Sequence, residues 1–130
     1  MKSKRIQLVL SLALFCLCLP LQAFSQTKIA YGQDPMQYGE LYLPAGEGPF
    51  PIVTFLHAGC WRSSEGMMNS YRAMAKAMTE QGIAAWNMQY RGATSPGGGW
   101  PGPWLDIANG FAALQEGAQS TPIAPDRAVV

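Results

Sequence analysis

Short apolar runs separated by Gly- and Pro-rich segments are the main pattern of this chain. Residues 52–56 and 83–90 are nearly continuous apolar runs, and turn residues bound each of them. A strand buried on both faces of a sheet has this composition, so both segments are predicted to be central strands. Residues 126–130 begin a third buried strand after a predicted turn at residues 122–125. Residues 37–43 alternate in part, which predicts a half-buried strand.

Two segments between these strands have the three- and four-residue spacing of amphipathic helices. In the first, Ser63 or Ser64 can cap the N-terminus, and Gly82 can end the helix. Its apolar face is predicted to contain Met67, Tyr71, Met74, Ala75 and Met78, with Met68 as a further core residue. The second helix is predicted over residues 104–119, with Ile107, Phe111 and Leu114 directed inward.

The order of these elements indicates an α/β fold. Strands that alternate with helices pair in parallel through right-handed crossovers, which gives a mostly parallel sheet with helices on both faces. In such sheets the functional sites form beyond the carboxyl ends of the strands. Residues 57–61 and 91–100 follow the two central strands directly, so any chemistry is expected there.

The first 25 residues have the pattern of a secretory signal peptide. Three basic residues precede an apolar run at residues 6–19, and small residues at Ala23 and Ser25 form a cleavage site. The run is short for a membrane span, which needs about 20 apolar residues, although a retained anchor stays an alternative. We therefore expect an exported protein, secreted or periplasmic, that has no membrane segment after cleavage and folds as one partial domain over residues 26–130.

Charge and cysteine content narrow the classes of function. The whole chain has a net charge of +1, and removing the three N-terminal basic residues leaves six basic and eight acidic residues, or −2. Without a basic patch, nucleic acid is not expected as a partner. Only Cys60 remains after cleavage, so no intrachain disulfide is expected.

Residues 97–99 are three glycines, but Trp100-Pro101 follows them and would obstruct a phosphate, so no cofactor is expected, and no metal cluster is present.

Residues 55–61 form the most informative motif. They lie between a predicted buried strand and a helix, where a tight turn of small residues exposes consecutive backbone N–H groups. Such groups can stabilise the negative oxygen that forms when a nucleophile attacks an ester carbonyl. The motif therefore indicates an oxyanion-binding turn.

With His-Ala-Gly-Cys-Trp at residues 57–61, the chain resembles the α/β-hydrolase family, in its esterase branch with a His-Gly-Gly-x-Trp-type oxyanion motif. Three further segments resemble that family in the same order, at residues 86–92, 97–106 and 126–130. The resemblance implies a secreted serine hydrolase, carboxylesterase- or lipase-like, that cleaves small-molecule carboxylic esters. Ala58 departs from the family's glycine, at a cost if positive φ is required there and at none if only small size matters.

The resemblance also implies roles for individual residues. The backbone amides of Gly59 and Cys60 would donate to the oxyanion, while His57 would hold the loop by hydrogen bonds. Trp61 would pack beneath the loop or line the substrate pocket, and Trp100 would wall that pocket or cover the core.

Arg91 and Asp106 are expected to form a structural ion pair, with Asp106 in the first turn of its helix, where it complements the helix dipole. This pair would tie the loop after the second central strand to the following helix.

The catalytic residues of a serine hydrolase are missing from these 130 residues. The sequence has no Gly-x-Ser-x-Gly elbow, which in this family follows the strand that begins near Asp126. His57 is the only histidine, so Cys60 lacks a second histidine to activate it as a nucleophile. We expect a truncated, inactive N-terminal part of an ester hydrolase. The alternative is a non-catalytic remnant or binding module of the same fold.

Overall fold

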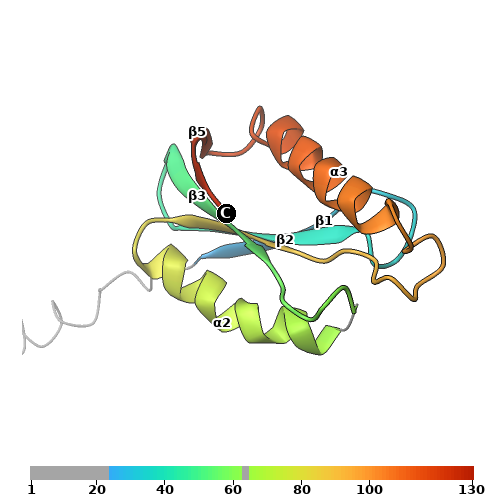
Figure 1. The fold of residues 1–130 in the computed structure, drawn as a ribbon. Helices are drawn as coiled ribbons and strands as arrows, with labels where there is room; N and C mark the ends of the chain where they lie inside the picture. The colour runs from blue at the N-terminus through green and yellow to red at the C-terminus, as the bar shows by residue number, and fades with distance from the viewer. Residues whose placement is uncertain (1–23, 63–64) are drawn as a thin grey trace, which may run out of the picture.

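The computed structural model describes residues 24–62 and 65–130, which fold into one sheet between two helices (Figure 1). The strands are β1 (Ser25–Ala30), β2 (Tyr38–Leu43), β3 (Phe50–Leu56), β4 (Ala84–Met88) and β5 (Ile123–Val129). The helices are α2 (Glu65–Glu80) and α3 (Gly102–Gly117). Most of the predicted signal peptide and the predicted helix caps Ser63 and Ser64 lie outside the described residues.

The sheet is mixed, in the order β1-β2-β4-β3-β5. Strand β3 is parallel to both β4 and β5, whereas β2 is antiparallel to β4 and to β1. The predicted parallel core is therefore confirmed, with an antiparallel pair of strands beside it. Strand β1 was not predicted, because its six residues are mostly polar and largely exposed and therefore have no hydrophobic period.

The two crossovers place the helices on opposite faces of the sheet. The chain moves from β3 to β4 through α2 and then travels back past β3 to β5 through α3. Because such crossovers are right-handed, reversing the direction of travel moves the helix to the other face, and Figure 1 shows α2 and α3 on either side of the sheet. The connections leaving β3 and β4 thus diverge at the carboxyl ends of these two strands, the position at which open α/β sheets form their binding sites.

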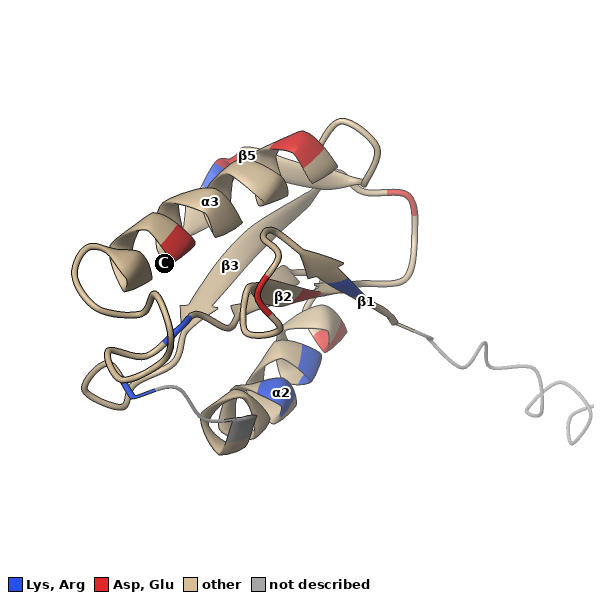
Figure 2. Cartoon of the chain, turned by 90° about the vertical axis from the view of Figure 1, so that its right-hand side faces the viewer, with Lys and Arg blue, Asp and Glu red and all other residues tan. Residues whose placement is uncertain are grey.

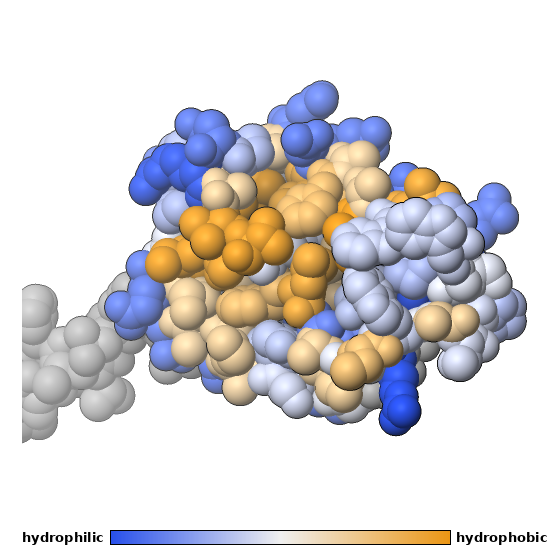
Figure 3. Space-filling model, viewed as in Figure 1, coloured by the Kyte–Doolittle hydropathy of each residue, from blue (hydrophilic) through white to orange (hydrophobic). Residues whose placement is uncertain are grey.

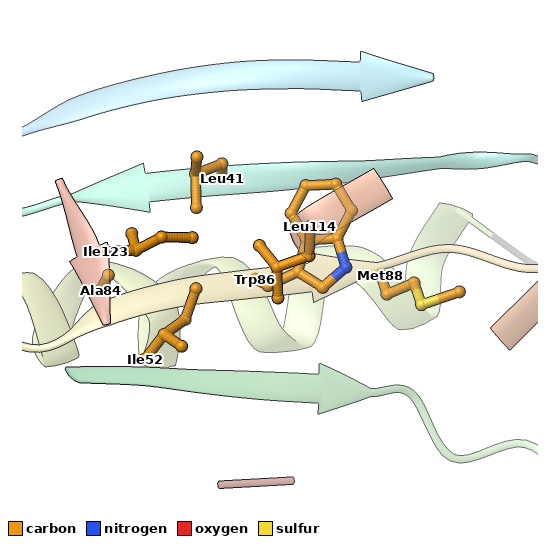
Figure 4. Packing of buried hydrophobic residues seen from close by; sticks show 7 residues of the cluster. All are labelled: Leu41, Ile52, Ala84, Trp86, Met88, Leu114 and Ile123. Carbon is orange, nitrogen blue, oxygen red and sulfur yellow. The ribbon is translucent and has the colours of Figure 1, made fainter. Parts of the chain in front are cut away.

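The larger core lies between the sheet and α3. Trp86 of β4 is fully buried at its centre, as Figure 4 shows. The other buried members of this cluster are Leu41, Ile52, Ala84, Met88, Leu114 and Ile123. Gly39 is required beside Trp86, since a Cβ at position 39 would lie 2.1 Å from the indole Cζ2. Predicted inward residues Ile107 and Phe111 are only partly buried, and Leu114 is buried as expected.

Strand β2 is buried on both faces, so the half-buried prediction is wrong. Leu41 belongs to the core under α3, and Tyr42 belongs to a second core with Ala75 and Ala85 on the α2 side. Glu40 is also buried, 4% exposed, and it accepts hydrogen bonds from the Tyr42 hydroxyl and from Arg72 of α2. The charge of Glu40 in the alternating pattern suggested a face exposed to solvent. Instead, Arg72 from α2 pairs with the Glu40 carboxylate and neutralises its charge.

Helix α2 begins and ends close to the predicted positions, but its buried face is rotated. Met68 and Ala75 are fully buried, whereas Met74 is 47% exposed, against the prediction. The helix ends as predicted at Gly82, which has φ 73°. The Gly82 amide donates to Thr79 and the Ile83 amide donates to Met78, which is a Schellman motif.

Strand β5 is an edge strand of the described sheet, not the buried strand that the sequence predicts. Only Ile123 and Ala124 are buried, and residues 125–129 are exposed. The predicted turn at residues 122–125 is also wrong, since the strand already begins at Ile123. Figure 3 shows hydrophobic residues gathered on the surface over β3 and β5, where Val129 is 66% exposed and Val130 is 72% exposed.

Charged residues are interspersed over the molecule. Figure 2 shows basic residues on β1, α2, β5 and the loops, with acidic residues among them. In the described part of the chain, neither helix is long and apolar enough to cross a membrane.

Candidate functional site

The turn after β3 has an unusual backbone. The Arg62 amide donates to the Gly59 carbonyl over 2.9 Å, which closes a four-residue turn. Its two central residues, Cys60 and Trp61, have φ values of 51° and 62°, and Gly59 has φ 135°. Left-handed backbone at a residue other than glycine costs on the order of 1–3 kcal/mol and concentrates at functional sites. The fold therefore maintains this turn against its local preference.

The turn leaves backbone donors free. Across residues 24–62 and 65–130, no hydrogen bond engages the amides of Gly59 or Cys60. Ala58 is not among the residues with positive φ, so its side chain is accommodated without backbone strain. The departure from glycine at position 58 is thus harmless to the shape of the turn. The sequence-predicted donors lie at the carboxyl end of β3, as the motif requires.

His57 holds the base of the turn. It is 2% exposed, and its ring stacks on Tyr90 with centroids 4.2 Å apart. Its Nε2 lies 2.6 Å from Gln89 Oε1, and the Tyr90 hydroxyl donates to the His57 carbonyl over 2.7 Å. Because Gln89 Oε1 also accepts from the Tyr90 amide, that atom must be the oxygen, and His57 donates through Nε2. The expected structural role of His57 agrees with this geometry.

Gln89 is a positioning residue that the sequence did not reveal. It lies just past β4, is fully buried, and connects that strand to the turn after β3. Its backbone carbonyl also accepts from the Tyr31 hydroxyl. Burial, followed by the nearby Asp106 carboxylate, raises the pKa of Tyr31 far above its usual value, so this hydroxyl keeps its proton and remains a donor.

The predicted ion pair between Arg91 and Asp106 is confirmed. Arg91 donates to the fully buried carboxylate through its amide at 3.0 Å, its Nε at 2.9 Å and its Nη2 at 2.7 Å. Gln37 Nε2 adds a fourth donor at 2.7 Å. Burial by itself raises the pKa of Asp106, but the hydrogen bonds from Arg91 and Gln37 outweigh it and hold that pKa below its ordinary value. Asp106 lies in the second turn of α3, not the first, because the helix begins at Gly102.

An apolar cavity of about 220 Å³ lies beside the turn. Its lining residues are Trp61, Ala93, Gly98, Trp100, Pro103 and Trp104. Trp61 and Trp100, the two sequence-predicted pocket residues, are thus brought together. Trp100 is 82% exposed, which rules out the alternative that it covers the core. Trp104, which the sequence indicated only as the start of a helix, was not predicted to line the pocket.

Cys60 is exposed and unpaired. Its thiol has no imidazole partner among the described residues, since both ring nitrogens of His57 face other groups of the protein. In the same residues no three His, Cys, Asp or Glu side chains are grouped as metal ligands.

Several solved structures share this architecture. An α/β hydrolase enzyme, MGS-M1, from a Medee basin deep-sea metagenome library superposes with a TM-score of 0.67 at 17% identity, over 83% of this chain and 46% of its own. A bacterial heroin esterase gives a TM-score of 0.65 at 23% identity, over 92% of this chain and 39% of its own. Esterase B from Lactobacillus Rhamnosis (HN001) gives 0.63 at 20% identity, over 98% and 44%.

These similarities establish the class of fold. No protein-family model and no curated protein matches the sequence. The chain has a partial α/β-hydrolase-like fold, and it spans less than half the length of the three solved structures above.

Proposed function

We propose that this chain forms the oxyanion-binding part of an exported serine hydrolase that cleaves small-molecule carboxylic esters. The supporting observation is the turn after β3, where the amides of Gly59 and Cys60 have no hydrogen-bond partner among the described residues and Trp61 lines an apolar cavity. The solved structures of similar fold include esterases, which agrees with this reaction class.

In this proposal the two amides act on the transition state. Attack on an ester carbonyl places negative charge on its oxygen, and preorganised backbone donors stabilise that charge without reorganising. The hydrogen bond between His57 and Gln89 anchors the turn to the end of the neighbouring strand, so its donors have a fixed direction. The proposed acyl transfer uses no cofactor.

The nucleophile is proposed to follow β5 in the whole protein. Strand β5 is parallel to β3, so both strands direct their carboxyl ends to the same edge of the sheet. A serine on a sharp turn after β5 would therefore approach the edge at which Gly59 and Cys60 lie. This order of oxyanion turn first and nucleophile elbow later is the one that α/β-hydrolases use.

The test compares two polypeptides in hydrolysis of p-nitrophenyl acetate. We expect turnover by the product of the full natural reading frame, and none above the buffer blank by the 130-residue chain. A folded full-length product without hydrolysis would contradict the proposal and favour a binding module. Turnover by the 130-residue chain that disappears in Cys60→Ala would instead make Cys60 the nucleophile.

A further inference from the structure

The geometry of the three exposed tryptophans points to a subsite for a planar aromatic ring of the substrate. We propose that Trp61, Trp100 and Trp104 bind such a ring next to the oxyanion turn, so that the preferred ligands are aromatic esters. The ligand's identity as an ester rests on the proposed function, whereas the preference for an aromatic ring rests on the cavity alone.

The tryptophans form a continuous aromatic wall. Trp61 and Trp104 lie with ring centroids 4.9 Å apart, and Trp104 and Trp100 lie 6.3 Å apart with nearly perpendicular rings. All three expose much of their surface: Trp61 is 42% exposed, Trp104 is 49% exposed and Trp100 is 82% exposed. Large apolar groups left exposed together mark binding sites on soluble proteins. This wall therefore presents both ring faces and ring edges to a guest.

The cavity has the size and chemistry for one ring. An engineered apolar cavity of roughly 150 Å³ already holds benzene, and this one measures about 220 Å³. Trp61 and Trp104 are too close for a guest to be inserted between them. A planar guest would stack on one exposed indole face and meet the perpendicular ring edge-on, the two arrangements that aromatic pairs prefer.

The lining offers no ionic partner to an anionic guest. None of the six lining residues has an ammonium, guanidinium or hydroxyl group in its side chain. Burying an anionic group without hydrogen-bond partners costs several kcal/mol in an apolar environment. The walls therefore favour a flat group that carries no negative charge.

The cavity is joined to the oxyanion turn by covalent and hydrogen bonds. Trp61 is the third residue of that turn, and its carbonyl accepts from the Ala93 amide over 2.6 Å. A ring seated on the tryptophans would thus be near Gly59 and Cys60, whose amides have no hydrogen-bond partner in the part of the chain that the structure describes. This proximity makes the subsite part of an ester-binding site and not a separate surface.

The test measures binding of matched esters to the 130-residue chain by NMR, with the indole N–H signals as probes, below the concentration at which light scattering detects self-association. Methyl benzoate is compared with methyl cyclohexanecarboxylate, and phenyl acetate with cyclohexyl acetate, which places the ring on the acyl or the alcohol side. We expect about 2- to 10-fold tighter binding of the aromatic member of at least one pair, the range that an aromatic contact supplies beyond area burial.

Variants distinguish binding at the three tryptophans from non-specific hydrophobic binding to the protein surface. Trp100→Ala should abolish the preference and Trp100→Phe should retain most of it, because Trp100 is largely exposed and neither change disturbs the core. Leu105→Ala, which removes a 54% exposed residue outside the cavity lining, should change nothing. Equal binding within both pairs, or a preference that survives Trp100→Ala, would overturn the proposal.

The outcome is independent of catalysis. Aromatic preference without hydrolysis by the full-length protein would leave the subsite intact and refute the proposed function. Hydrolysis of both members of each pair with equal kcat/KM would support the proposed function and refute the aromatic subsite.

Discussion

Nε2 of His57 lies 2.6 Å from Oε1 of Gln89, although 32 positions separate the two residues in the chain. Each follows one of two neighbouring parallel strands, β3 and β4. Their hydrogen bond joins the carboxyl ends of these strands, where the connections to α2 and α3 diverge. The proposed oxyanion turn is therefore anchored to the sheet through a side chain of the adjacent strand end.

Replacing Gln89 by Leu should destabilise the protein by about 1–3 kcal/mol, because the buried His57 N–H and Tyr90 N–H lose their acceptor. Urea unfolding followed by circular dichroism measures the change. Gln115→Leu is the matched control on an exposed position of α3, expected to lie within about 0.5 kcal/mol of the parent. Equal stability of the two variants would show that the His57–Gln89 bond contributes nothing.

Stability should fall in acid. The pKa of Asp106 and the pKa of Glu40 are both lowered in the fold, since hydrogen bonds from Arg91 and Arg72 outweigh the effect of burial. Carboxylates of this kind stabilise the fold above their unfolded-state pKa of about 4, and the contribution is lost as pH falls through the lower folded-state pKa. Unfolding midpoints measured from pH 7 to pH 2.5 should therefore decline mainly below about pH 4.

The variant Asp106→Asn tests the source of that decline. It leaves Arg91 without its charged partner, so we expect a loss of about 3–5 kcal/mol at pH 7 and a shallower dependence on pH below 4. Glu116→Gln, at an exposed position of the same helix, should change stability at pH 7 by no more than about 0.5 kcal/mol. An unchanged acid slope in Asp106→Asn would assign the decline to other groups.

Gly59→Val should lower kcat for ester hydrolysis by the full-length protein about 10²- to 10³-fold, comparable to losing one oxyanion donor. Gly59 has φ 135°, and a Cβ there would lie 3.2 Å from Met67 Cε and 3.3 Å from the Arg62 carbonyl oxygen, so a branched side chain would displace the turn. Ala58→Gly should keep activity unchanged or raise it modestly. Full activity in a folded Gly59→Val protein would mean that this turn does not bind the oxyanion.

Export is predicted to remove residues 1–25. Mass spectrometry of the exported protein should find Gln26, or its cyclised form, at the N-terminus. Cleavage there is compatible with the fold, because β1 would lose only Ser25 and would keep its pairing with β2 from Gln26 to Ala30. An intact Met1 on a membrane-bound product would contradict this prediction.

The edge at β5 should promote self-association of the 130-residue chain. Unpaired strand edges with exposed apolar residues recruit other chains, and Val129 is 66% exposed at this edge. Val129→Lys should reduce light scattering at a given concentration, because a charged edge strand resists pairing. Met74→Lys, a comparable exchange on the exposed side of α2, is the control and should leave the scattering high. Equal scattering of both variants and the parent would locate association elsewhere.

The sequence alone determined those features that depend on local residue type. The continuous apolar runs predicted strands at β3 and β4, because strands covered on both faces need apolar residues at every position. Strand β4 is buried throughout as predicted, whereas only Ile52 and Thr54 of β3 are buried. Gly82 predicted the end of α2, because its left-handed conformation is accessible to glycine at little cost. The motif at residues 57–61 predicted where a turn with free amides would form, and the structure contains a strained turn there.

Tertiary structure alone decided which side chains are buried and which residues meet. Strand β1 forms through long-range backbone pairing with β2, which its polar side chains do not reveal. A small rotation of α2 about its axis exposes Met74 and buries Thr79, since successive helical residues point about 100° apart. Trp104 joins Trp61 and Trp100 only because the start of α3 lies beside the turn after β3. These outcomes depend on contacts between segments distant in sequence, and local sequence patterns do not predict such contacts.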